Sequence, residues 1–149
     1  MSALFLIMLR KNPYFYINFY AMKKLICLLL LTLTIISCEA QQKRGTELVS
    51  PKQFSEAMAK DKGQLIDVRT PKEYKAGHLE GAANIHLYDQ DFNERINKLD
   101  KKKTVYVYCK AGGRSADAVE SLKLNGFQHI VELDGGTDAW TEAGKPLKQ

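Results

Sequence analysis

The sequence is poor in cysteine, in acidic residues near its N-terminus and in long apolar runs. Its 149 residues include three cysteines, and no aspartate or glutamate precedes Glu39. The apolar run at residues 25–36 has about a dozen residues, fewer than the roughly 20 that an ordinary membrane-spanning helix needs. Internal repeats and low-complexity segments are also lacking, which excludes solenoid and fibrous architectures.

The basic character of the chain belongs to its first quarter. The formal net charge is +5, but four of the basic residues precede residue 38, so the remainder carries about +1: Arg10, Lys11, Lys23 and Lys24. No basic stripe with interleaved aromatic residues is present, so we expect no nucleic-acid partner.

Residues 22–37 have the layout of an export signal. Lys23 and Lys24 precede the apolar run, and small or polar residues follow it. The run ends in Ile35-Ile36-Ser37-Cys38, which resembles the lipobox of bacterial lipoproteins, and the resemblance implies lipid on Cys38. The alternatives are a plain signal peptide cleaved nearby and an uncleaved anchor.

The segment upstream of Met22 is apolar and aromatic, but Arg10, Lys11 and Pro13 interrupt it. Met22 begins the better signal, so we interpret residues 1–21 as an over-extended start without a function of their own. A second real hydrophobic segment is the alternative.

Cysteine usage singles out one thiol. Cys27 would leave with the signal and Cys38 would carry lipid, so Cys109 is the only free thiol that remains. An internal disulfide is then impossible, a zinc site lacks ligands, and an odd cysteine in an exported domain indicates a reactive thiol or an intermolecular partner.

The polar residues 38–46 are predicted to be a tether, and residues 47–149 to be one folded domain of common size. A capping box at Ser50, followed by proline, begins one helical pattern. Thr70-Pro71 opens a second, short helix that Gly77 ends. Further helices are expected at 89–99, 115–124 and 137–143, the last anchored by Trp140, and strands at 64–68, 84–87, 104–108 and 130–133. Alternating strands and helices predict a mainly parallel sheet covered on both faces.

Cys109 stands at the carboxyl end of one predicted strand, where ligands bind in sheets of this kind. The loop after it holds Gly112 and Gly113, which permit positive φ and inward-facing N–H groups, and a helix begins at once. With Lys110 and Arg114 nearby, we expect the pKa of Cys109 to be lowered. A buried inert cysteine and a phosphate-binding turn are the alternatives.

The segment Cys109-Lys110-Ala111-Gly112-Gly113-Arg114-Ser115 resembles the active-site loop of rhodanese-type sulfurtransferases. The segments LIDVR with EY at 65–74, GHLEGA with Asn84, and DGG with Trp140 and AGKP at 134–146 resemble other motifs of that family, in order and at its spacing. The resemblance implies an α/β fold of three layers, with a central, mainly parallel five-stranded sheet.

The resemblance also implies that sulfane sulfur moves through a persulfide on Cys109, from a small anionic donor such as thiosulfate to a thiol or cyanide-like acceptor. The N–H groups of residues 110–115 would stabilise the persulfide, and Arg114 would steer the donor. Asp67, Arg69 and His78 are expected to support the loops structurally. No metal or organic cofactor is implied.

Two other functions stay open at this point. One is a persulfide carrier with little turnover of free thiosulfate. The other is a cysteine-dependent phosphatase, although such loops have five residues between cysteine and arginine, whereas four separate Cys109 from Arg114. We further expect a monomer, exported and attached through Cys38 to a membrane of the bacterial cell envelope.

Overall fold

The computed structural model describes residues 22–24, 26 and 45–149, and the predicted tether and lipidated cysteine at 38 lie outside them except for the last tether residues, 45 and 46. Residues 43–149 form one compact unit. Its strands are β1 (Gly45–Val49), β2 (Gln64–Asp67), β3 (Ala83–Asn84), β4 (Val105–Tyr108) and β5 (His129–Leu133). Its helices are α3 (Pro51–Lys60), α4 (Pro71–Ala76), α5 (Phe92–Ile96), α6 (Gly113–Leu124) and α7 (Gly136–Glu142).

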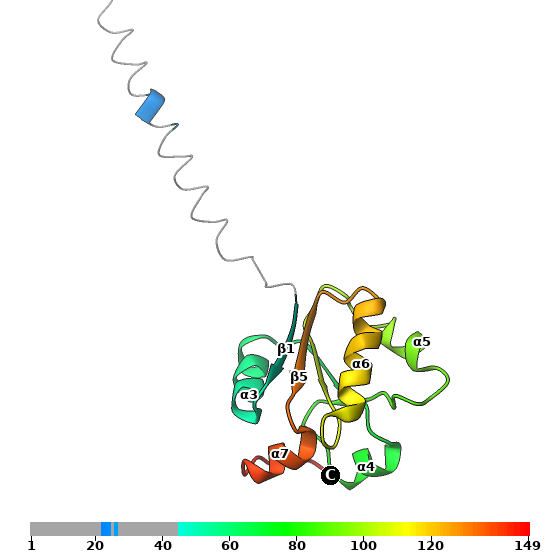
Figure 1. The fold of residues 1–149 in the computed structure, drawn as a ribbon. Helices are drawn as coiled ribbons and strands as arrows, with labels where there is room; N and C mark the ends of the chain where they lie inside the picture. Colours follow the sequence, from blue (N-terminus) through cyan, green and yellow to red (C-terminus); the bar gives the residue numbers. More distant parts are fainter. Residues whose placement is uncertain (1–21, 25, 27–44) are drawn as a thin grey trace, which may run out of the picture. The chain divides into compact units, whose positions relative to one another are not determined.

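The five strands form one sheet in the order β1-β5-β4-β2-β3, and every pair is parallel. This confirms the predicted fold class. Parallel strands place all their carboxyl ends at one edge, which is where the loops into α4, α6 and α7 begin (Figure 1).

Two apolar layers cover the sheet. On one face, α5 and α6 pack on the strands through residues such as Phe92, Ile96 and Leu122. On the other, α3 and α7 contribute Phe54 and Trp140, which meet edge to face with ring centroids 6.3 Å apart. The three layers of the predicted α/β/α architecture follow from these two cores.

Two capping boxes define where α3 and α4 begin, the predicted one at Ser50 and a second at Thr70. Ser50 and Thr70 each accept a hydrogen bond from the third residue of the helix, and the side chains of Gln53 and Glu73 bond back to the cap. Gly77 ends α4, as the sequence predicted.

Three elements differ from the prediction. A first strand, Gly45–Val49, was not predicted, and it begins inside the expected tether. The helix expected at 89–99 is confined to Phe92–Ile96, and β3 is two residues long instead of four. In each case the local pattern was weak, and pairing with neighbouring elements decides the structure.

Candidate active site

Cys109 directly follows β4 and is 1 % exposed. Along β4 the side chains alternate, so Val107 and Cys109 belong to the core beneath α6, whereas Tyr106 and Tyr108 belong to the opposite core. The thiol is free. The fold therefore places one buried sulfur between the end of the central strand and the beginning of α6.

The loop after Cys109 turns its N–H groups toward this sulfur. The N–H of Gly112 donates to Cys109 Sγ over 3.1 Å. Gly112 has φ of +105°, but Gly113 is the first residue of α6 and takes no positive φ. One left-handed glycine, not two, is thus enough to build the cradle.

Two opposing effects act on the pKa of Cys109. Burial raises it, since a thiolate loses hydration, but hydrogen bonds from the Ser115 hydroxyl and from the N–H groups of Ser115, Gly112 and Ala111 lower it. The hydrogen bonds prevail, so the pKa lies below its ordinary value. A lowered pKa increases the fraction of thiolate, which is the nucleophilic form of cysteine.

Arg114 does not lie free beside the sulfur. Its two terminal nitrogens each donate to one carboxylate oxygen of Glu73 over 2.8 Å. The Arg114 guanidinium and the Thr70 hydroxyl hold the pKa of Glu73 well below its usual range, against the effect of burial. The pair joins α4 to α6, and Glu73 compensates the charge of Arg114.

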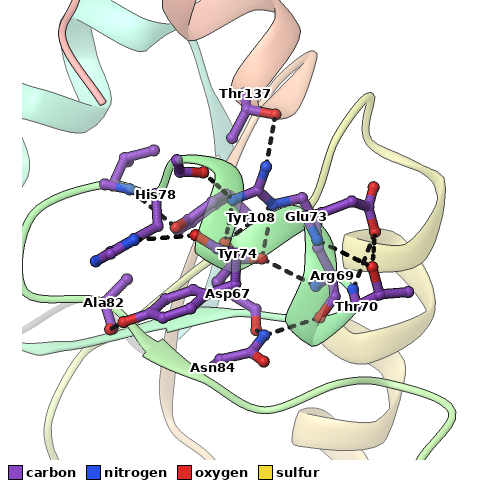
Figure 2. A network of polar contacts seen from close by, with 12 residues as sticks. Asp67, Arg69, Thr70, Glu73, Tyr74, His78, Ala82, Asn84, Tyr108 and Thr137 are labelled. Atoms are coloured by element: carbon purple, nitrogen blue, oxygen red, sulfur yellow. Dashed lines mark hydrogen bonds and ion pairs between the residues drawn. The ribbon is translucent and has the colours of Figure 1, made fainter. Parts of the chain in front are cut away.

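Behind the loop, Asp67 and Arg69 form a buried ion pair at the end of β2 (Figure 2), with 2.5 Å between Arg69 Nη2 and Asp67 Oδ2. Arg69 also donates to the carbonyl of Gly77 and to the hydroxyl of Thr137. It thereby links the strand end to the end of α4 and to the first turn of α7.

The beginning of α7 fixes the outer side of the cradle. The N–H groups of Thr137 and Asp138 donate to the carbonyl oxygens of Cys109 and Lys110, over 2.9 and 3.0 Å. These two carbonyls consequently point toward α7. Because the C=O and the N–H of one trans peptide unit point in opposite directions, the N–H of Ala111 faces away from α7, on the side of the sulfur.

His78 lies apart from this chemistry. Its ring stacks on Tyr74, with centroids 3.9 Å apart, and its Nδ1 lies 3.1 Å from the Tyr74 carbonyl oxygen. Its backbone exchanges two hydrogen bonds with Lys148. These contacts attach the C-terminal segment to the end of α4.

Two carboxylates near the site were not assigned a role from the sequence. Glu73 binds Arg114, and Glu132 of β5 lies under α6, where the hydroxyl of Ser115 is 2.7 Å from its Oε1. Neither has its partner close in the chain, so no spacing motif connects them. The one feature of the sequence that pointed to Glu73 was the resemblance of Glu73-Tyr74 to a family motif.

A shallow pocket of about 230 Å³ opens beside the loop. Lys110, Arg69 and Thr137 line it together with Glu73 and Asp138. Lys110 is exposed. The pocket therefore presents both basic and acidic side chains beside Lys110, the residue that follows Cys109.

Within residues 22–24, 26 and 45–149, no helix is long and apolar enough to cross a membrane. The same residues contain no cluster of three or more His, Cys, Asp or Glu placed to hold a metal ion.

The chain matches known proteins along most of its length. The family model described as "Rhodanese-like domain" matches residues 50–143. YqhL of Bacillus subtilis, an uncharacterised protein, is 36 % identical over 106 residues, which are 71 % of this chain and 81 % of YqhL.

Two other similarities add detail. A protein of Mycobacterium tuberculosis named "Probable adenylyltransferase/sulfurtransferase MoeZ" is 33 % identical over 115 residues, which cover 75 % of this chain but 29 % of MoeZ. The crystal structure of a rhodanese-related protein from Thermoplasma volcanium superposes with a TM-score of 0.61 at 31 % identity, covering 68 % of this chain and 97 % of that one.

Proposed function

Because the chain belongs to the rhodanese-like domain family, we propose that it is a sulfurtransferase that carries sulfane sulfur as a persulfide on Cys109. The observation that supports this most is the convergence of hydrogen-bond donors on one buried sulfur whose pKa they lower. Donors fixed in advance around a reacting atom stabilise negative charge without reorganisation during the reaction.

In the first half-reaction, the Cys109 thiolate attacks the outer sulfur of thiosulfate. A bond forms between Sγ and that sulfur, and the S–S bond of the donor breaks with its electron pair leaving on sulfite. The terminal sulfur of the persulfide then carries the negative charge, which the N–H groups of residues 111, 112 and 115 can stabilise. In the second half, a thiol or cyanide-like acceptor removes this sulfur and restores the thiolate, which gives ping-pong kinetics.

The anionic donor is attracted by Lys110 more than by Arg114. Lys110 is exposed on the loop, whereas Glu73 binds the guanidinium of Arg114 with two hydrogen bonds. A guanidinium whose charge is already compensated by a carboxylate attracts a dianion only weakly. The pocket beside Lys110 is where we expect the acceptor to approach.

A persulfide carrier that exchanges sulfur with a partner protein is the second candidate. The compensated charge of Arg114 favours it, because it weakens the attraction of free thiosulfate to the site. A phosphatase finds no such support, since the guanidinium that would bind phosphate is held by Glu73.

Thiosulfate and cyanide together test the function. The wild-type chain should form thiocyanate and, before cyanide is added, gain the mass of one sulfur. Cys109→Ala should lose both signals. A persulfide without turnover would select the carrier, and the absence of both signals from the wild type would refute either form of the proposal.

We propose also that the domain is exported as a monomer and held at a membrane of the cell envelope by lipid on Cys38. The lipobox-like residues before Cys38 support this. Labelled palmitate supplied to expressing cells should enter the wild type and not Cys38→Ala. Equal labelling of the two would contradict a lipid at this position.

A further inference from the structure

Glu132 is a carboxyl group in an apolar place. It lies on β5 in register with Val107 of β4, beneath α6, and it is 7 % exposed. The neighbouring residue on the same face of β5, Ile130, belongs to the hydrophobic core. Burial raises the pKa of Glu132, the Ser115 hydrogen bond lowers it, Asp134 raises it and Lys123 lowers it, with a raised pKa as the result.

The hydroxyl of Ser115 lies between Glu132 and the sulfur. Its Oγ is 2.7 Å from Glu132 Oε1, 2.8 Å from the carbonyl oxygen of Gly112 and 3.5 Å from Cys109 Sγ. A serine has one hydrogen to donate, so these three acceptors compete for it. Which of them receives it depends on the charge of Glu132.

An ionised Glu132 attracts the serine hydrogen most strongly, because hydrogen bonds to a carboxylate are shorter and stronger than neutral ones. The sulfur then loses a donor. A protonated Glu132 instead donates its own hydrogen to Ser115 Oγ, and the serine hydrogen is free to point at Sγ. The three groups thus form a chain whose direction the carboxyl group sets.

We propose that Glu132 is a positioning residue that carries a proton while Cys109 is a thiolate, so that Ser115 donates its hydrogen to the sulfur. The thiol proton passes to Ser115 Oγ as the serine hydrogen passes to Glu132 Oε1. This leaves a thiolate and a neutral carboxylic acid, with no change in net charge. The inference concerns the same nucleophile as the proposed function and rests on it.

The residues around Glu132, Ser115 and Cys109 are compatible with one proton shared among these three groups. The charged groups nearest to Glu132 are Lys123 on α6, which pairs with Glu120, and Asp134 after β5. The residues level with Glu132 on β1 and β4 are uncharged: Leu48 and Val107. On the side of the sulfur, Arg114 interacts electrostatically with Cys109, and Glu73 compensates the charge of Arg114.

Glu132→Gln tests the proposal, because the amide keeps the shape and can always donate to Ser115 but has no proton to lose. Thiolate formation is followed by ultraviolet absorbance as a function of pH on the full chain, with the spectrum of Cys109→Ala subtracted. The wild type should show a broad titration, since two coupled groups lose protons in overlapping steps. Glu132→Gln should show a single step at a pH lower by about one unit, a tenfold change in the equilibrium.

Ser115→Ala separates a relay from a simple charge effect. In that background the hydroxyl that connects the two groups is missing, so Glu132→Gln should shift the titration of Cys109 by less than about a third of the shift seen with Ser115 present. A residual shift of that size is within the few tenths of a kcal/mol to which independent substitutions usually add. An undiminished shift would mean that Glu132 acts through space, and it would overturn the proposal. Asp134→Asn is the matched control: it removes a neighbouring charge without touching Ser115 and should leave the broad titration in place.

A measurement on Glu132 itself needs no substitution, so it does not depend on whether the variants fold. The carbon NMR signal of the Glu132 carboxyl is titrated with Cys109 free and with Cys109 blocked as a neutral methyl disulfide. Blocking should lower the pKa of Glu132, and an unchanged pKa would overturn the proposal. Neither measurement uses a sulfur donor, so a failure of sulfur transfer in the wild type would be recognised separately.

Discussion

Single residues give Cys109 its acidity chiefly through hydrogen bonds. The sequence suggested Lys110 and Arg114 as cations beside the thiol, but the effects that lower the pKa of Cys109 come from Ser115 and from loop N–H groups. Arg114 is occupied by Glu73. A site of this kind depends little on ionic strength, because hydrogen bonds at short range are not screened by salt.

The ion pair between Glu73 and Arg114 predicts how the stability of the domain changes with pH. The pKa of Glu73 is lowered from its ordinary value of 4.5. The ionised carboxylate therefore contributes fully to the free energy of unfolding above pH 4.5, and this contribution falls as the pH drops below 4.5. Glu73→Gln should reduce the free energy of unfolding at neutral pH by about 1.5 kcal/mol. The difference from wild type should shrink in acid, as measured by urea unfolding at several pH values.

Glu80→Gln is the control for that measurement. Glu80 also forms an ion pair, with Lys148, but both side chains are largely exposed. Its substitution should change stability little at any pH. Equal effects of the two substitutions would contradict a special role of the Glu73 pair.

At this scale the sequence predicted the thiol around which the site is built but not the carboxylates that bind its neighbours. Cys109, the glycine turn and the beginning of α6 are adjacent in the chain, so local chemistry revealed them. Glu73 and Arg114 are 41 positions apart, and Ser115 and Glu132 are 17 apart. Only the folded sheet brings such pairs together, so no local pattern could predict them.

At the scale of elements, prediction succeeded where signals are local. The capping box at Ser50 and the Thr70-Pro71 pair correctly predicted the beginnings of α3 and α4. The strand β1 was missed because its residues, GTELV, have little apolar pattern and four of the five are exposed. It is a strand because β5 offers it a backbone edge, with Gly45 opposite His129 and Val49 opposite Leu133.

The contact between α7 and the loop predicts a severe effect of Gly136→Ala. Gly136 has φ of +57°, and a methyl group there would overlap the carbonyl oxygen of Cys109 and lie 2.6 Å from the carbonyl of Lys110. We expect loss of persulfide formation, together with destabilisation of about 2 kcal/mol or more. Mass spectrometry of the sulfur-loaded protein and thermal unfolding measure the two effects.

Gly144→Ala provides the matched comparison. Gly144 also has positive φ, +71°, but nothing lies within 4 Å of a methyl group added there. It should cost about 1 kcal/mol from backbone strain alone, with persulfide formation retained. If both variants lost activity alike, the contact with the loop would not be the cause.

At the scale of the whole molecule, the domain extends to the beginning of β1 and not only to Glu47. Removal of residues 1–42 should leave the compact unit that contains residues 45–149 intact. Removing residues 1–49 takes away β1 and exposes the edge of β5. The shorter chain should unfold at lower urea concentration and aggregate through that edge, which light scattering would detect. Equal stability of the two chains would show that β1 is dispensable.

The hydrogen bonds from Thr137 and Asp138 to the loop also concern the order of events during synthesis. Cys109 and the groups that donate to its sulfur are complete in sequence by residue 115, yet the carbonyls of Cys109 and Lys110 accept hydrogen bonds from a helix that begins at Gly136. A nascent chain that has emerged only as far as α6 lacks the residues that donate these two hydrogen bonds. We therefore expect the loop to reach its final geometry, and Cys109 its full acidity, only when α7 docks.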